Sequence, residues 1–240
     1  DGIRDLVRSR GLGDVYKRQI LIHGGGFERG AKEDERQVAL AKSLTEHGYA
    51  CFLINYRLVR DYPPAPPEYA DLLSRAAHAA AVDAKTALRH VCANARKYGI
   101  DPERVALIGS SAGAIAALAA GLSAPDRFIG DGGGYPAPTE NMPHAPARAA
   151  AIVNLWGTAD FFPELFSTES PPIMTVHGAK DFRVGLSLLP AENIDAQCKQ
   201  YGIPHRYYPL SEAGHGAWDA VVDGKPLDML VVEFLDEYLK

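Results

Sequence analysis

The sequence predicts an α/β fold in which a mainly parallel sheet of about six strands is covered by helices on both faces. Short apolar runs alternate along the chain with longer helical stretches, and this alternation is typical of parallel strands joined by helical crossovers. The chain has 240 residues, of which 47% are apolar and 23% charged. This length and composition fit one globular domain with a sizeable core.

Six apolar runs are predicted to form the strands. Each is short and ends at glycine, proline or polar turn residues, as buried strands usually do. They lie at residues 20–22, 49–56, 104–108, 150–155, 173–176 and 206–209. The proline-rich segment 61–67 and the glycine- and proline-rich segment 126–146 are predicted to be loops.

Helices are predicted between these strands and after the last one. They lie at residues 33–47, 71–97, 111–122, 190–201 and 227–239. Gly48 and Gly99 follow the first two, and glycine is a common residue at the C-terminal end of a helix. The helices therefore separate consecutive strands, as a parallel sheet requires.

Residues 1–19 differ from the rest of the chain. They hold five basic and three acidic residues and show no steady apolar period. The segment lacks the apolar region and the cleavage site of a signal peptide, and it resembles translated sequencing-adapter read-through. We interpret residues 1–19 as a non-native or adapter-derived head and residues 20–240 as the folded domain. The localisation stays open, because the true N-terminus is expected to be missing.

Charge and composition exclude several classes of function. The formal net charge is −5 and no basic block stands out, so we expect no nucleic-acid partner. The three cysteines, Cys51, Cys92 and Cys198, are too widely spaced for a disulfide framework or a zinc site. No His-Glu-x-x-His motif is present, and no apolar run approaches the ~18 residues that span a bilayer. We expect no metal, no cofactor and no membrane span, and the oligomeric state stays open.

The sharpest motif predicts a serine nucleophile. Residues 109–113 read Gly-Ser-Ser-Ala-Gly and match the pattern G-x-S-x-G with Ser111 at the centre. Such a serine lies on a tight turn between a strand and a helix, where flanking side chains would clash and glycine is needed. The predicted strand 104–108 and helix 111–122 supply this context. Ser110 is off-centre in the motif and is not expected to be the nucleophile.

A glycine loop follows the first predicted strand. Residues 23–27 read His-Gly-Gly-Gly-Phe. Successive glycines let backbone N–H groups approach a substrate and stabilise the oxyanion that forms during acyl transfer. We expect the N–H groups of Gly25, Gly26 and Ala112 to form this oxyanion hole. A plain turn or a phosphate cradle is the alternative, but the loop lacks the G-x-G-x-x-G spacing and the lysine of nucleotide sites.

A serine nucleophile needs a base and an orienting carboxylate, expected here in the chain order Ser, acid, His. His215 is the favoured base, because it lies between two glycines in a loop after the last predicted strand. Asp181 is the favoured acid, because it lies one strand before the histidine; Asp160, which follows the preceding strand, is the alternative. The other histidines occupy positions with ordinary structural roles: His23, His47, His78, His90, His144, His177 and His205.

Five motifs occur in one order: HGGGF, NYRL at 55–58, GSSAG, HGAKD at 177–181 and GHGAW at 214–218. With them, residues 20–240 resemble the α/β-hydrolase carboxylesterases, in particular small bacterial feruloyl- and acetylxylan-esterase-like and hormone-sensitive-lipase-like enzymes. The resemblance implies an α/β-hydrolase catalytic domain in which Ser111 is acylated, His215 moves the proton and Asp181 orients His215. It also implies two further strands before the strand at 20–22, and residues 1–19 do not match them. We therefore expect an N-terminally truncated domain in which strand 49–56 is an exposed edge.

The leading hypothesis is a serine esterase acting on short-chain acyl esters, either small molecules or polymer-linked. An arylformamidase- or peptidase-like amide hydrolase and a catalytically silent hydrolase-fold binding protein are the alternatives. Loop 126–146 is too short for a separate cap, so we expect at most a small lid. Four aromatic residues beside the motifs are candidates for an acyl or feruloyl pocket, and ordinary core packing is the alternative for each: Phe27, Trp156, Phe182 and Trp218.

Overall fold

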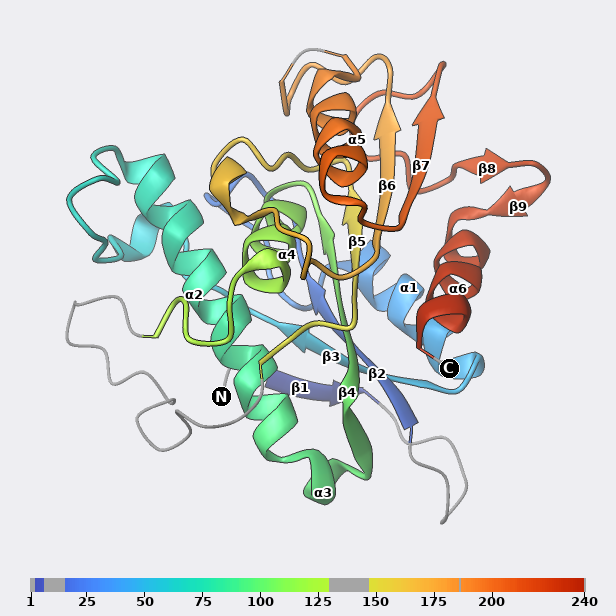
Figure 1. Cartoon of the computed structure of the whole chain (residues 1–240), viewed down its shortest axis with the longest axis horizontal. Coiled ribbons are helices and arrows are strands. Elements are labelled where there is room, and N and C mark those ends of the chain that lie inside the picture. The colour runs from blue at the N-terminus through green and yellow to red at the C-terminus, as the bar shows by residue number, and fades with distance from the viewer. Residues whose placement is uncertain (1–2, 7–15, 130–146, 186, 240) are drawn as a thin grey trace.

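The computed structural model describes residues 3–6, 16–129, 147–185 and 187–239. Within these ranges a seven-stranded sheet runs through the molecule with helices on both faces (Figure 1). The strands stand in the order β1-β3-β2-β4-β5-β6-β7, and every neighbouring pair is parallel except β1 and β3. Their bounds are β1 (Ile3–Leu6), β2 (Tyr16–Ile22), β3 (Tyr49–Ile54), β4 (Ile100–Ser110), β5 (Ala151–Leu155), β6 (Ile173–Gly178) and β7 (His205–Leu210).

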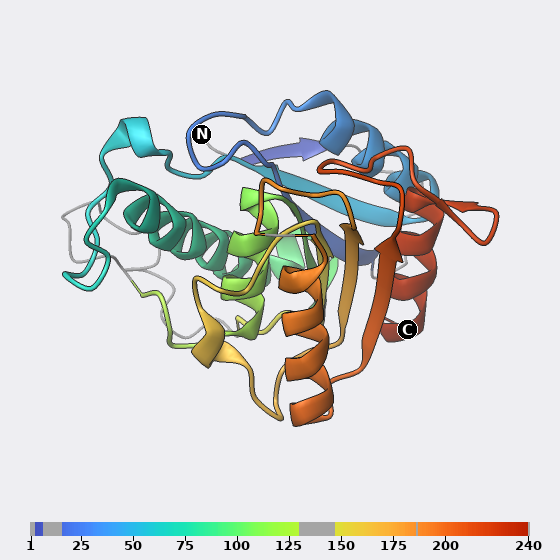
Figure 2. The ribbon, with the colours of Figure 1, turned by 90° about the horizontal axis from the view of Figure 1, so that it is seen from above.

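The helices form two layers. Helices α1 and α6 cover one face of the sheet, and α2, α4 and α5 cover the other (Figure 2). The helix bounds are α1 (Glu35–Glu46), α2 (Leu72–Ala93), α3 (Ala95–Tyr98), α4 (Ala112–Leu122), α5 (Leu189–Tyr201) and α6 (Leu227–Tyr238). Two 3₁₀ turns, η1 (Val59–Asp61) and η3 (Pro163–Leu165), and a hairpin of β8 (Val221–Val222) and β9 (Lys225–Pro226) complete the described elements.

The central strands are buried on both faces. In β2, Ile20 and Ile22 pack against the layer that contains α2 and α4, whereas Leu21 packs against the layer that contains α1 and α6. All three side chains are at most 1% exposed. Alternate residues of a strand point to opposite faces, so the end of β2 that is covered on both sides, residues 20–22, is a continuous apolar run. The predicted α/β architecture, with its mainly parallel sheet, is confirmed.

One strand lies where the sequence pattern shows none. Strand β1 pairs antiparallel with the outer side of β3, with Ile3 opposite Ile54 and Leu6 opposite Cys51. The expectation that β3 forms an exposed edge is therefore wrong, because β1 takes the edge position. A strand of four residues is too short for an alternating pattern to stand out. Residues 16–19, which the pattern assigned to the head, begin β2; residues 7–15 lie outside the described ranges, and the foreign head stays a prediction.

The predicted helix 71–97 is two helices. Asp71 caps α2 by accepting hydrogen bonds from the N–H groups of Leu73 and Ser74 at 2.9 Å. The helix ends at Asn94, whose ψ of 18° departs from helical geometry, and α3 follows directly. Over the described part of the chain, no helix is long and apolar enough to cross a membrane.

A buried lysine of α2 binds the end of α4. The side chain of Lys85 is fully buried, and its Nζ donates to the carbonyls of Ala120 and Ser123, both at 2.9 Å. The last carbonyls of a helix have no intrahelical donor, so Lys85 supplies the missing partners. Burial, followed by the positive charges of Arg89 and Arg148, lowers the pKa of Lys85 to about 7.

Replacing Lys85 by Met is expected to make the free energy of unfolding less dependent on pH. The pKa of Lys85 is lower in the folded chain than its ordinary value of 10.5. The folded chain therefore binds fewer protons than the unfolded chain between these two values, and the stability contributed by Lys85 rises with pH. Between about pH 7 and pH 9, we expect the free energy of unfolding of the wild type to rise by about 1–3 kcal/mol relative to that of Lys85→Met.

Urea unfolding of both proteins at the two pH values measures this gain. Lys42→Met is the matched control, because it removes an exposed lysine from α1. A difference between wild type and Lys85→Met that stays constant with pH would contradict the prediction.

Candidate active site

Ser111 lies on a sharp turn between β4 and α4. Its φ of 54° and ψ of −122° belong to a region that non-glycine residues rarely occupy. The turn is tight, because a Cβ on Gly109 would lie 2.1 Å from the Gly113 carbonyl oxygen. A Cβ on Gly113 would likewise lie 2.1 Å from the Ile22 carbonyl oxygen of β2. Both glycines of the motif are therefore required by space, as the sequence predicts.

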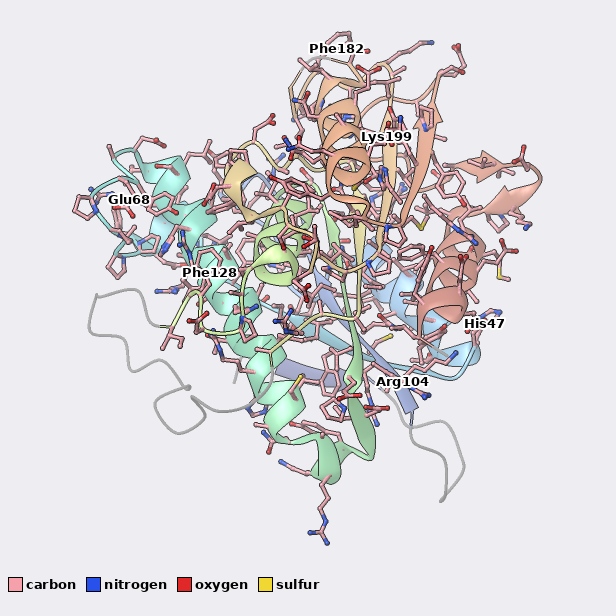
Figure 3. All side chains as sticks on the ribbon, viewed as in Figure 1. His47, Glu68, Arg104, Phe128, Phe182 and Lys199 are labelled. Carbon is pink, nitrogen blue, oxygen red and sulfur yellow. The ribbon has the colours of Figure 1, made fainter. Side chains whose placement is uncertain are left out.

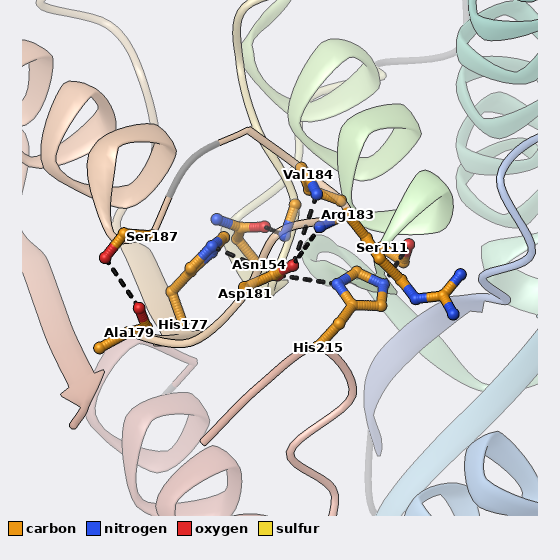
Figure 4. Close-up of polar contacts among 10 residues, drawn as sticks. Ser111, Asn154, His177, Ala179, Asp181, Arg183, Val184, Ser187 and His215 are labelled. Carbon is orange, nitrogen blue, oxygen red and sulfur yellow. Dashed lines mark hydrogen bonds and ion pairs between the residues drawn. The ribbon is translucent and has the colours of Figure 1, made fainter. Parts of the chain in front are cut away.

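A continuous chain of hydrogen bonds joins Ser111, His215 and Asp181 (Figure 4). His215 Nε2 lies 2.8 Å from Ser111 Oγ, and His215 Nδ1 lies 2.8 Å from Asp181 Oδ2. The three residues follow β4, β6 and β7, whose carboxyl ends meet at one edge of the parallel sheet. The structure thus brings together the three residues that the sequence singles out as nucleophile, base and acid.

The loop after β6 fixes the carboxylate of Asp181. This side chain is fully buried, whereas that of His215 is 19% exposed. Asp181 Oδ1 accepts a hydrogen bond from the backbone N–H of Arg183 at 2.8 Å. The backbone carbonyl of Asp181 accepts from the N–H of Ser187 at 2.9 Å, and the Ser187 hydroxyl donates to the Ala179 carbonyl at 2.8 Å. These bonds leave Oδ2 directed at His215.

The glycine loop passes directly beside Ser111. A Cβ on Gly24 would lie 3.3 Å from the Cβ of Ser111. Gly25 and Gly26 have φ values of 124° and 65°, which favour glycine, and the carbonyl of Gly25 accepts from the N–H groups of Glu28 and Arg29 in the turn that follows. Within the described turns and loops, neither the N–H of Gly25 nor that of Gly26 donates a backbone hydrogen bond. Ala112 is the first residue of α4, where helical N–H groups lack an internal acceptor. The three expected oxyanion donors therefore come from segments that meet at Ser111.

Ser110, the neighbour of Ser111, has a different environment. It is 4% exposed, and its Oγ accepts a hydrogen bond from Gln37 Nε2 at 3.0 Å. The same amide nitrogen donates to the Ile22 carbonyl at 3.1 Å. Gln37 thus links α1 to the ends of β2 and β4, beneath the turn that carries Ser111.

The alternative carboxylate, Asp160, and the glycine-loop histidine, His23, take no part in this chain of hydrogen bonds. Asp160 is exposed, and its Oδ1 accepts a hydrogen bond from Asn193 Nδ2 at 3.5 Å. His23 is buried, with its ring stacked on Tyr56 at 4.4 Å, and burial lowers its pKa. His144 lies outside the described residues. Across the described ranges, no group of three or more His, Cys, Asp or Glu side chains is arranged to hold a metal ion.

Comparison with known proteins places this chain in a family. Residues 5–167 match the BD-FAE family, which is more than half of the sequence. The chain belongs to the BD-FAE family. Esterase LipC of Mycobacterium tuberculosis (strain ATCC 25618 / H37Rv) is 25% identical over 244 residues, which are 85% of this chain and 56% of that protein. The BD-FAE chain thus spans about half the length of this curated relative.

Solved structures share the fold of this BD-FAE chain. An acetyl ester-xyloside bifunctional hydrolase from Caldicellulosiruptor lactoaceticus aligns over 98% of this chain and 87% of its own, with 19% identity and a TM-score of 0.72. A truncated carbohydrate esterase from gut microbiota aligns over 94% of this chain and 86% of its own, with 18% identity and a TM-score of 0.74. An esterase from the Planctomycetes species Thermogutta terrifontis aligns over 98% of this chain and 88% of its own, with 19% identity and a TM-score of 0.72. The likeness confirms the α/β-hydrolase fold expected from the sequence.

The four aromatic candidates do not form one wall of a pocket in the BD-FAE chain. Phe27 packs in the core beside α2 and α4, whereas Trp156 belongs to the core on the other face. Trp156 and Trp218 contact each other edge to face, with ring centroids 5.0 Å apart. Phe182 is 74% exposed and projects from the surface (Figure 3). Core packing therefore accounts for Phe27 and Trp156, and a binding role for the four residues stays a prediction.

Sequence reasoning missed two buried side chains at this site. Gln37 braces the turn that carries Ser111, and His177 lies beside Asp181. A signal for Gln37 was available, because it falls on the apolar face of the predicted helix 33–47. His177 stands four residues before Asp181 in the HGAKD motif, and only the direction of its side chain shows that the two meet.

Proposed function

We propose that this protein is a serine carboxylester hydrolase that cleaves short-chain acyl esters through an acyl-enzyme on Ser111. The observation that carries the proposal is the hydrogen-bonded series from Asp181 through His215 to Ser111, in a chain of the BD-FAE family. Acyl transfer by serine needs this arrangement, because the hydroxyl is a weak nucleophile until a base takes its proton.

In the first half of the reaction, Ser111 Oγ attacks the ester carbonyl carbon and its proton passes to His215 Nε2. The 2.8 Å contact between these atoms is short enough for direct transfer. Asp181 accepts the Nδ1–H of His215 and stabilises the imidazolium that forms. The bond to the alkoxy group then breaks, and His215 returns its proton to the departing alcohol.

Negative charge on the carbonyl oxygen is stabilised by the N–H groups of Gly25, Gly26 and Ala112. Each such donor is worth about 2.7–4 kcal/mol in the transition state. The N-terminus of α4 adds the positive end of its dipole at the same point.

In the second half, the oxygen of a water molecule attacks the acyl carbon while His215 takes a proton from that water. The bond to Ser111 Oγ breaks, and the proton returns to that oxygen. The products are a carboxylic acid and the free enzyme, so no cofactor is consumed.

Related proteins support short acyl groups as substrates. The Thermogutta terrifontis esterase Est2 has been solved with propionate and with butyrate bound. A structure of Thermogutta terrifontis esterase 2 phosphonylated by cyclosarin has also been solved. Esterase LipC is an esterase by name. These names favour ester hydrolysis over the amide and binding alternatives for this chain.

Hydrolysis of p-nitrophenyl acetate, butyrate and dodecanoate, compared with p-nitroacetanilide, tests the proposal. We expect turnover of the two short esters at about 1–1000 per second, with slower dodecanoate and anilide hydrolysis. Labelling by a fluorophosphonate is expected at Ser111. Faster anilide cleavage would favour the amide hydrolase, and an absence of both turnover and labelling would favour the silent binding protein.

A further inference from the structure

A second histidine contacts the carboxylate of Asp181 from the side opposite His215 (Figure 4). His177 stands at the end of β6, and its side chain is fully buried. Its Nε2 lies 3.4 Å from Asp181 Oδ2. That oxygen is the one that accepts the hydrogen bond from His215 Nδ1 at 2.8 Å. One carboxylate oxygen is therefore shared between two imidazole rings.

The ring nitrogens of His177 face two polar partners, the carboxylate of Asp181 and the backbone of Ser187. Among the described residues, neither Nδ1 nor Nε2 makes a hydrogen bond within normal geometry. Burying an imidazole in this way costs free energy that an apolar side chain would not. Asp181 Oδ2 is the charged acceptor that faces Nε2, and a shift of a few tenths of an ångström would close a hydrogen bond between them.

The charge state of His177 follows from its surroundings. Burial lowers its pKa, the nearby His215 lowers it further, and Asp181 opposes both effects. These are the titratable groups that act on the ring, and the backbone of Ser187 is the other polar group that does so. His177 is therefore neutral near pH 7 and carries one N–H, which the carboxylate attracts to Nε2.

We propose that His177 is a positioning residue that donates its Nε2–H to Asp181 Oδ2 and holds this carboxylate against His215 during proton transfer. The proposal rests on the proposed function, since it assigns His177 a role in the same reaction. Donors at Oδ1 and Oδ2 together fix the rotation of the carboxylate. The donor at Oδ2 also withdraws negative charge from the oxygen that supports the His215 imidazolium.

Two variants separate this role from simple packing. His177→Leu fills much of the space but has no N–H, whereas His177→Gln places an amide N–H near the position of Nε2. We expect His177→Leu to lower kcat about tenfold with little change in KM, as loss of a partner to a catalytic group commonly does. Loss of the donor leaves more negative charge on Oδ2, so the acid limb of kcat/KM should move to higher pH. His177→Gln is expected to restore most of kcat and the original pH profile.

His205→Leu is the matched control. His205 also has a buried side chain that contacts a carboxylate, at 3.1 Å from Asp195 Oδ1, but it lies outside the chain of hydrogen bonds to Ser111. We expect this variant to lose stability without a shift of the pH profile. Thermal unfolding of all three variants shows whether each is folded under the assay conditions.

Proton NMR tests the contact without any assay of activity. The proton shared by His215 Nδ1 and Asp181 is expected to give a strongly downfield resonance, which His177→Leu shifts and His177→Gln preserves. The inference is overturned if His177→Leu keeps the wild-type resonance and pH profile, or if His177→Gln behaves like His177→Leu. If His177→Leu shifts this resonance and His177→Gln preserves it, but the wild type hydrolyses no ester, the proposed function alone is refuted.

Discussion

Replacing Ser111 by Ala is expected to lower kcat for p-nitrophenyl butyrate hydrolysis by about a millionfold. No other hydroxyl is held 2.8 Å from His215 Nε2 in the described structure, so no acyl-enzyme can form. The residual rate over water would come from the oxyanion donors and from binding. KM and thermal stability should change little, because the variant removes one oxygen atom from a partly exposed turn. Stopped assays at high enzyme concentration can measure so low a rate.

Ser110→Ala is the matched control for this prediction. It removes the same group one residue earlier, where the hydroxyl accepts a hydrogen bond from Gln37 Nε2. We expect its kcat to stay within about fivefold of wild type, as is usual when one neutral hydrogen bond is lost. If the Ser111→Ala protein still hydrolyses the ester at the wild-type rate, Ser111 is not the nucleophile.

Replacing Asp181 by Asn is expected to lower kcat by about ten-thousandfold. The N–H of Arg183 donates to Oδ1, so the single oxygen of the new amide would take that position. The amide nitrogen would then face His215 Nδ1 and donate to it. His215 would carry its proton on Nε2, where it could no longer accept the proton of Ser111. The loss should appear in kcat measured under saturating ester.

Asp160→Asn gives the comparison for Asp181→Asn. Asp160 follows the preceding strand and is exposed, with its Oδ1 3.5 Å from Asn193 Nδ2. We expect near wild-type kcat from it. If instead Asp160→Asn caused the large loss and Asp181→Asn did not, the assignment of the carboxylate would have to be reversed.

Local chemistry explains why part of the site could be predicted from sequence. The turn at Ser111 needs Gly109 and Gly113 at fixed spacing, and such a requirement is visible in five consecutive residues. The choice between Asp160 and Asp181 depends instead on which strand lies next to β7. Chain order favoured Asp181, and the pairing of β6 with β7 gives that preference its physical basis.

Other features depend on contacts that a sequence pattern does not encode. Strand β1 has four residues and is recognised only by its pairing with β3. His177 alternates with apolar neighbours along β6 like any strand residue, and its contact with Asp181 arises because the chain turns back after Gly178. A Cβ on Gly178 would lie 2.4 Å from the Ala213 carbonyl oxygen, so the β6 and β7 loops approach each other closely there.

Helix α4 is restrained along its axis at both ends. At its start, Gly113 packs so closely on the Ile22 carbonyl that a methyl group would not fit, and at its end Lys85 binds the carbonyls of Ala120 and Ser123. These two contacts oppose a shift of the helix along its axis. In the proposed mechanism the N–H of Ala112 would be preorganised, and stabilising an oxyanion there would require almost no reorganisation energy. Mutations that loosen the distant Lys85 end should then reduce kcat more than they reduce substrate affinity.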